Sequence, residues 1–210
     1  MIKKDAQARR IGIFGASGSG KTTKALDLVA KVNRLIAFDP LDDLTQIKTR
    51  ISDLEYLKKF VLKNYAKSFR VRFVPNLAKA KEQLSEISLF LRELQAGYKF
   101  NRHNALVTLF VDELDTSFPL NISRSMGENG FYFLCCRGRH YGINIVGISQ
   151  RMSLVDLPFR ANLSDLFVFR LADFNDIKAA TQMLGTPYRQ RIIDLTNFKY
   201  IYKNPEGVIK

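Results

Sequence analysis

One segment near the N-terminus constrains the fold more than any other part of this sequence. A short apolar run at residues 11–14 leads into GASGSGKT at residues 15–22, which fits the pattern G-x-x-x-x-G-K-[ST] and precedes a helix-forming stretch. Glycines in such a loop let backbone N–H groups turn toward phosphate oxygens at the N-terminus of the helix. The sequence therefore predicts a phosphate-binding loop between a strand and a helix.

Two side chains of this loop carry specific expectations. We expect Lys21 to bridge the β- and γ-phosphate oxygens of a nucleoside triphosphate such as ATP, and Thr22 to bind Mg²⁺. The residues expected to contact the nucleotide are Gly15, Ala16, Ser17, Gly18, Ser19, Gly20, Lys21, Thr22 and Thr23.

The rest of the chain alternates short apolar runs with helical stretches, the order typical of a mostly parallel sheet between helices. Several runs lack polar alternation, as burial on both faces requires. Turn residues at 204–207 predict a C-terminal edge hairpin. We expect one domain over residues 1–210, with a core at about 11–184 and a C-terminal helix and hairpin at 185–210. Predicted strands are 11–14, 35–38, 69–74, 105–111, 143–149, 166–169 and 200–202, and predicted helices are 21–32, 52–67, 77–95, 130–137 and 174–184.

Composition limits the kind of partner and compartment. The 210 residues include 33 Lys and Arg against 20 Asp and Glu, a formal net charge of +13. That balance favours a polyanionic partner, and a solvated basic surface is the alternative. Two adjacent cysteines, Cys135 and Cys136, are too few for a disulfide framework, which indicates a reducing compartment. No apolar run approaches the roughly 20 residues that a membrane helix needs, so we expect no membrane span.

The apolar run at 105–111 ends in two carboxylates. A phosphate loop needs an acidic partner for its metal at the end of a neighbouring strand, and Asp112 is expected there, holding Mg²⁺ with Thr22. Glu113 is expected to polarise the water that attacks the γ-phosphate. A small-molecule kinase needs no base directly after the metal-binding Asp, so Glu113 favours hydrolysis. The alternative is that Glu113 faces solvent.

The next predicted strand, 143–149, ends at Gln150. We expect this residue on the same sheet edge, beside the acidic pair. Its amide can hydrogen-bond the γ-phosphate oxygens or the attacking water, and it can signal hydrolysis to the loop at 151–162. An ordinary loop residue is the alternative.

Taken together, these segments resemble the FtsK-HerA superfamily of DNA-translocating ATPases. The resemblance rests on the phosphate loop, the strand closed by Asp112 and Glu113, the segment RGRHYG at 137–142, and Gln150 with Arg151. The compact genome-packaging ATPases of membrane-containing icosahedral viruses are the most similar members. The resemblance covers residues 11 to about 184 and implies a RecA-like P-loop NTPase core, ring assembly and ATP-driven movement of double-stranded DNA. Residues 38–73 and the C-terminal hairpin carry no assignable motif.

The resemblance maps Arg139 onto an arginine that precedes the strand bearing the glutamine. A strand rises about 3.3 Å per residue, which puts Arg139 roughly 20 Å or more from its own nucleotide edge. We therefore expect Arg139 to serve the ATP of a neighbouring subunit as an arginine finger. Arg137 is the substitute candidate, and a plain surface or DNA-contacting arginine is the alternative.

Basic residues are spread over several stretches without a recognition motif. This favours contact with the DNA backbone over base readout, although a solvated helix face explains any single lysine equally well. Loops that follow Asp112 and Gln150 can move with the nucleotide state. The expected pore contacts there are Arg124, Arg151 and Arg160.

The sequence thus predicts a homo-oligomeric ATPase, a hexameric rather than pentameric ring, that packages viral double-stranded DNA into a preformed capsid. Capsid vertex or portal proteins are expected partners, and the cytoplasm of the infected cell or the packaging vertex is the expected location. Alternatives are a cellular or plasmid translocase or helicase of the same superfamily, a filamentous-phage assembly ATPase, which should carry a membrane helix, and a small-molecule P-loop kinase. A nucleotide-regulated binding protein is disfavoured because Lys21, Asp112 and Glu113 are all present.

Overall fold

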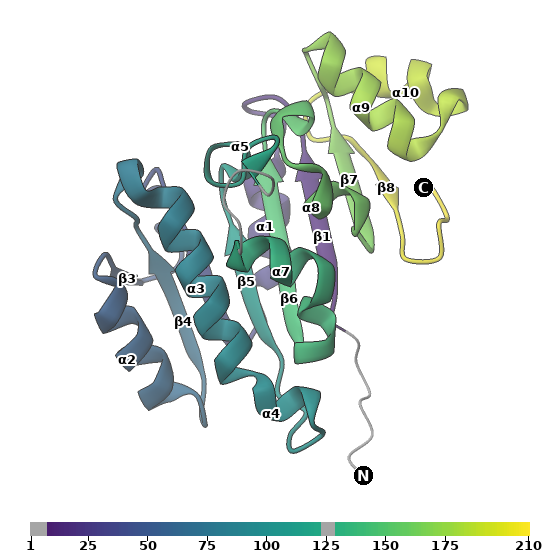
Figure 1. Cartoon of the computed structure of the whole chain (residues 1–210). Coiled ribbons are helices and arrows are strands. Elements are labelled where there is room, and N and C mark those ends of the chain that lie inside the picture. The colour runs from purple at the N-terminus through teal and green to yellow at the C-terminus, as the bar shows by residue number, and fades with distance from the viewer. Residues whose placement is uncertain (1–7, 123–128) are drawn as a thin grey trace.

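The computed structural model describes residues 8–122 and 129–210 and shows a three-layer α/β fold (Figure 1). Its eight-stranded sheet has the order β3-β4-β2-β5-β6-β1-β7-β8. Every strand pairing is parallel except that of β7 with β8. The strands are β1 (Arg10–Phe14), β2 (Arg34–Phe38), β3 (Thr49–Ile51), β4 (Phe69–Phe73), β5 (Val107–Val111), β6 (Ile143–Ser149), β7 (Asp165–Phe169) and β8 (Tyr200–Lys203).

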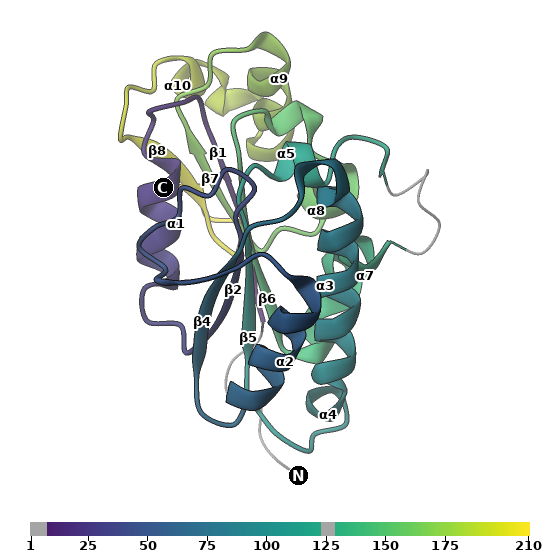
Figure 2. The same ribbon diagram turned by 90° about the vertical axis from the view of Figure 1, so that its left-hand side faces the viewer.

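Helices cover the two faces of the sheet unequally. Helix α1 packs on one face, whereas α2, α3, α7 and α8 lie on the other (Figure 2). Helices α9 and α10 lie beyond the carboxyl ends of the strands (Figure 1). The helices are α1 (Lys21–Val29), α2 (Leu54–Asn64), α3 (Ala80–Leu94), α4 (Ala96–Lys99), α5 (Leu114–Ser117), α7 (Gly130–Arg137), α8 (Leu157–Ala161), α9 (Phe174–Leu184) and α10 (Arg189–Ile193).

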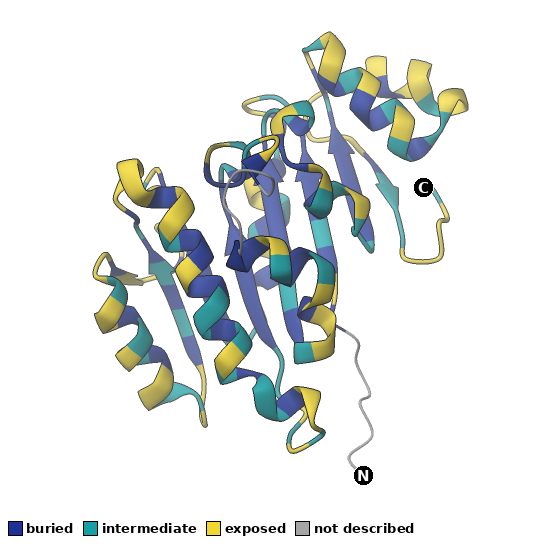
Figure 3. Ribbon diagram, in the orientation of Figure 1, coloured by how far each residue is buried: buried dark blue, intermediate teal, exposed yellow. Residues whose placement is uncertain are grey.

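Successive residues of the central strands face opposite layers, as strand geometry requires. In β1, Ile13 packs with the α1 layer and Phe14 with the opposite layer, and Ala37 and Phe38 of β2 divide in the same way. Both sets of side chains are fully buried. Figure 3 shows the result, a buried sheet between helices whose outer sides are exposed. The two-sided burial expected from unbroken apolar runs is confirmed.

Most predicted elements match the structure to within a few residues. Strand β6 and helices α7 and α9 have the predicted bounds. Strand β3 was not predicted, because in its sequence TRI only Ile51 is apolar and buried. Residues 77–79 form a 3-10 turn instead of the start of a helix, which begins at Ala80. The predicted edge hairpin is confirmed: β8 pairs antiparallel with β7, and the chain folds back so that Lys203 pairs with Ile209.

One topological expectation was wrong. The strand that carries Asp112 was expected to neighbour the strand of the phosphate loop, but β6 lies between β5 and β1. Pairing of parallel strands need not follow chain order, because it depends on where each crossover connection places the next strand in the sheet. The consequence is that Gln150, at the end of β6, stands between the acidic pair and the phosphate loop.

No helix among the described residues is both long enough and apolar enough to cross a membrane.

Candidate nucleotide site

The phosphate loop joins β1 to α1 at the carboxyl edge of the sheet. Gly18 and Gly20 have φ angles of 69° and 103°, a left-handed conformation that side chains disfavour. Gly20 is the N-cap of α1 and has no side chain to occupy the first N–H groups of the helix. The buried hydroxyl of Ser19 has no hydrogen-bond partner within the described ranges. The loop thus offers backbone and side-chain donors to an anion.

Lys21 is placed inside this loop. Its side chain lies across the loop, with Nζ donating to the carbonyl oxygen of Ala16 at 2.9 Å, and the residue is only 8% exposed. Burial lowers the pKa of Lys21, and the carboxylates of Glu113, Asp112 and Asp115 act in the opposite direction. Lysine and carboxylates therefore meet at one edge, as the sequence predicted. Thr22 and Thr23 are exposed in the first turn of α1.

Asp112 lies directly after β5 and is 5% exposed. Burial raises its pKa to about 7, the charges of Glu113, Asp43 and Asp39 add to that rise, and a hydrogen bond from the Glu113 N–H opposes it. Carboxylate oxygens of Asp39, Asp43 and Asp112 all lie within 4.8 Å of one another. Several carboxylates held this close repel one another, and a bound cation relieves that repulsion. An all-oxygen donor set of this kind suits Mg²⁺.

Glu113 and Gln150 are in direct contact. The Gln150 amide Nε2 donates to Glu113 Oε1 at 2.8 Å. Glu113 has a φ of 44°, rare for a residue with a side chain, and the following helix α5 begins from it. Backbone strain of this kind is found at functional sites, where the surrounding structure holds it in place. The prediction that Glu113 and Gln150 share one edge is confirmed in geometry.

Other predicted site residues lie elsewhere or already have partners. Arg139 lies before β6, at the edge of the sheet opposite the phosphate loop, and is exposed. Arg151 donates from Nε to Asp176 at 2.9 Å and forms an ion pair with Asp173 at 3.3 Å. The half-buried Arg160 donates from Nε to the Val155 carbonyl oxygen at 2.9 Å, and burial lowers its pKa. Arg124 lies outside the described residues.

Sequence reasoning missed four residues of this edge. Asp39 and Asp43 follow β2 in the segment FDPLDD, where carboxylates directly after a buried strand were the available signal. Asp115 accepts a hydrogen bond from the hydroxyl of Ser149, the last residue of β6, at 2.6 Å. Phe198 donates its backbone N–H to the Ser19 carbonyl oxygen at 2.9 Å although 71% of the residue is exposed, and no sequence signal marks it.

Comparison with known proteins agrees with this geometry. The sequence profile of the zonular occludens toxin (Zot) family matches residues 13–171. The genome packaging NTPase B204 of Sulfolobus turreted icosahedral virus 2, solved with AMPPCP, has a similar structure, with a TM-score of 0.69, 13% identity and coverage of 96% of this chain and 95% of that one. ATPases 2 and 3 of Thermomonospora curvata EccC, solved with a signal sequence peptide, give a TM-score of 0.59 at 19% identity, covering 94% and 36%. No curated protein matches this chain in sequence.

The resemblance drawn from the motifs is confirmed at the level of fold, since these neighbours share the architecture along nearly the whole chain. The family profile runs from within β1 to just beyond β7, so it contains the phosphate loop, both carboxylates after β5 and Gln150. The protein is therefore a P-loop ATPase, and it belongs to the zonular occludens toxin (Zot) family.

Proposed function

We propose that this ATPase hydrolyses ATP with Glu113 as the general base. The observation that carries the proposal is the hydrogen bond from Gln150 to Glu113, because it fixes a carboxylate at the edge where Lys21 and Asp112 also lie. A base after the metal-binding Asp serves an attacking water, whereas transfer to a metabolite hydroxyl does not require it there. Lys21 and the loop N–H groups hold the phosphates, and Gln150 orients the base.

Mg²⁺ is the cofactor that these residues fit. Thr22 and Asp112 would hold it, and Asp39 and Asp43 add negative charge beside it. The ion supplies charge neutralisation on the β- and γ-phosphates. Because the pKa of Asp112 is raised to about 7, proton and cation compete for this carboxylate near neutral pH.

Phe198 is proposed to contact the nucleotide base. Its backbone is tied to Ser19 of the phosphate loop, and its φ of 64° is rare for an aromatic residue. A Cβ built on Gly20 would lie 3.0 Å from the Phe198 ring. An exposed aromatic ring held beside the start of α1 offers a flat apolar surface to a purine.

Double-stranded DNA is the proposed cargo. The net charge of +13 favours a polyanion over a peptide. Genome packaging is also the role of the B204 NTPase, which this fold matches over 95% of that chain. We propose backbone contact without base readout, in a homo-oligomeric ring in which Arg139 reaches the ATP of the next subunit. Packaging at a capsid vertex in an infected cell is the corresponding biological setting.

The test is steady-state ATP hydrolysis with Mg²⁺, with and without random-sequence duplex DNA, alongside a salt titration of DNA binding. We expect DNA to stimulate turnover and the binding constant to fall with a logarithmic slope near −5, as about six phosphate contacts require. A duplex of scrambled sequence is the matched control and should behave in the same way. If the turnover rate does not change with DNA and no DNA binds at low salt, DNA is not the cargo. The assignment as an ATPase would not be affected.

A further inference from the structure

A polar cavity lies at the amino edge of the sheet, away from the phosphate loop. Its volume is about 590 Å³, which is within the size range of small-molecule sites. Among the described residues, the arginines that line it are Arg9, just before β1, Arg10, the first residue of β1, and Arg139, before β6. Cys136 of α7 and Ser164 also line it, and no carboxylate does so within the part of the chain that the structure describes.

Arg10 is the unusual member of this cavity. It is 7% exposed, and its buried Nε and Nη2 have no hydrogen-bond partner among the described residues. Buried polar groups are paired in the great majority of cases, and a guanidinium without acceptors is costly. Burial, together with the charge of Arg139, lowers the pKa of Arg10. Arg10 also lines the cavity, so two donors without acceptors belong to a side chain that borders it.

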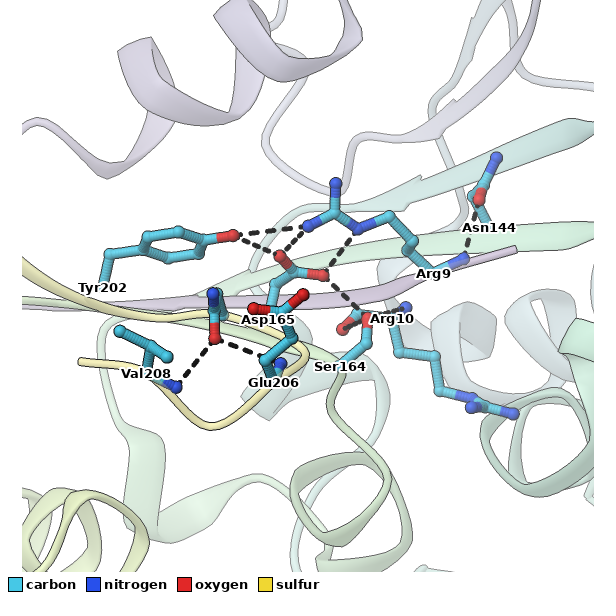
Figure 4. Close-up of polar contacts among 9 residues, drawn as sticks. Arg9, Arg10, Asn144, Ser164, Asp165, Tyr202, Glu206 and Val208 are labelled. Carbon is cyan, nitrogen blue, oxygen red and sulfur yellow. Dashed lines mark hydrogen bonds and ion pairs between the residues drawn. The ribbon is translucent and has the colours of Figure 1, made fainter. Parts of the chain in front are cut away.

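The neighbouring Arg9 has hydrogen-bond acceptors, so the lack of acceptors is particular to Arg10. Arg9 donates from Nε to Asp165 at 2.8 Å and forms an ion pair with the same carboxylate, which also accepts from the Tyr202 hydroxyl at 2.7 Å (Figure 4). Successive strand residues point to opposite faces, so Asp165 serves Arg9 and not Arg10. In Figure 4 the Arg10 side chain extends away from Asp165, and its guanidinium has no dashed contact.

The backbone of Arg10 is firmly held. Its N–H donates to the Ser164 hydroxyl at 2.9 Å, and that hydroxyl lies 3.0 Å from the Arg10 carbonyl oxygen. The strand pairs on both sides, with β6 and β7. The guanidinium is therefore presented by a rigid element, which lowers the entropy that a ligand would have to remove on binding.

We propose that this cavity is a binding site for a phosphate group, separate from the phosphate loop. Arg9 is already paired with Asp165, but the guanidinium groups of Arg10 and Arg139 have no ion pair among the described residues. Together they match a multiply charged tetrahedral oxyanion, which accepts hydrogen bonds from more than one arginine. Free phosphate and a phosphate of the DNA backbone share this chemistry. The site goes beyond the proposed hydrolysis, since it uses Arg10 and lies at the opposite edge of the sheet.

Cys136 provides a local probe of this site. It is partly exposed and lines the cavity, whereas Cys135 is fully buried and burial raises the pKa of its thiol well above the ordinary value, so Cys135 is unreactive. The experiment compares the rates at which an anionic sulfonate-bearing and a cationic trimethylammonium-bearing methanethiosulfonate label the native chain. We expect the anionic reagent to react about tenfold faster, because the local field attracts it. Cys136→Ser identifies the labelled thiol.

Inorganic phosphate and a short duplex DNA are then added as separate protecting probes. Phosphate should slow labelling in the native chain and in Lys21→Ala, and the protecting concentration should rise about tenfold in Arg10→Met, the loss of roughly one charge-assisted hydrogen bond. If phosphate protects Cys136 at a lower concentration than DNA does, the natural ligand is free phosphate. If DNA protects at the lower concentration, the ligand is a phosphate of the DNA backbone. Two results would overturn the site. One is an equal labelling rate with both reagents in the native chain, and the other is loss of phosphate protection in Lys21→Ala but not in Arg10→Met. The reagent comparison needs no variant and so does not depend on the folding of Arg10→Met.

Discussion

The two edges of one sheet present opposite charge. At the carboxyl edge, Asp39, Asp43 and Asp112 cluster, and the phosphate loop there carries the buried Lys21. At the amino edge, arginines gather around a cavity, and Arg10 lacks acceptors among the described residues. Arg72 pairs with Asp39 at 3.2 Å, but the described residues show no ion pair for Asp43, Asp112 or Arg10. An unbalanced buried charge costs stability, so each edge is best explained by something that binds there.

The largest effect is expected from Arg139, which lies at the amino edge but is proposed to act on a carboxyl edge. Arg139→Ala should keep nucleotide binding and lose about 10³ to 10⁵ in hydrolysis rate, as removal of an arginine finger does. Steady-state turnover and nucleotide titration measure the two properties separately.

Mixing subunits shows whether Arg139 acts across an interface. Lys21→Ala and Arg139→Ala chains are each inactive in this scheme, but a mixed ring contains interfaces with an intact site and an intact arginine. Activity should partly recover on mixing. No recovery in oligomers shown to be mixed would place Arg139 in its own subunit's chemistry or in the fold.

Glu113→Gln should separate binding from chemistry at the carboxyl edge. The substitution keeps the contact distance to Gln150 but removes the base, so we expect turnover to fall about 10² to 10⁴ while ATP binding persists. Lys21→Ala is the contrasting variant and should weaken triphosphate binding itself, because Lys21 compensates phosphate charge before and during reaction. Near-normal turnover in Glu113→Gln would contradict its role as base.

Asp112 should make the metal-free protein lose stability as pH rises. Its pKa is about 7 in the folded chain and 3.8 ordinarily, so the folded state binds the proton more tightly. The resulting stabilisation is complete below about pH 4 and is lost as pH rises to about 7, by at most about 4 kcal/mol. Urea unfolding of the native chain and Asp112→Asn at pH 5 and pH 8 measures it. The difference in unfolding free energy between the native chain and Asp112→Asn should change with pH. Saturating Mg²⁺ should restore the stability of the native chain at pH 8.

At the amino edge, removing a paired charge and removing an unpaired charge should change the stability of the protein in different directions. Asp165→Ala removes acceptors from Arg9 and Tyr202 and should cost about 1 to 3 kcal/mol of unfolding free energy. Arg10→Met should cost nothing or raise stability, because it removes a buried charge without acceptors. Thermal unfolding of both variants in phosphate-free buffer makes the comparison. A large loss in Arg10→Met would show that Arg10 has a structural role.

The smallest effect is expected from Phe198. Phe198→Ala should raise the KM for ATP by up to about tenfold and leave kcat nearly unchanged, since ring contact with the base supports binding alone. Phe198→Tyr is the matched control that keeps the ring. A fall in kcat without a change in KM would contradict the proposed base contact.

The strongest local signals were read correctly from the sequence. The glycines of the phosphate loop are needed for backbone conformations that few other residues adopt, and unbroken apolar runs are needed for burial on both faces. These requirements act within one segment, so the loop, the class of fold and the bounds of β6, α7 and α9 followed directly. Strand β3 was not predicted because three residues with one apolar side chain are too few to show the hydrophobic pattern of a strand.

What the sequence by itself determined is the phosphate loop, the carboxylates after β5 and the glutamine after β6, because strand ends and loop glycines are local properties. Only the tertiary structure decided which of these residues meet. Strand order placed β6 between β5 and β1 and brought Asp39 and Asp43 to Asp112. The physical reason is that pairing between distant strands and the partners of buried charges depend on contacts across the whole sheet. No single segment of the sequence contains that information.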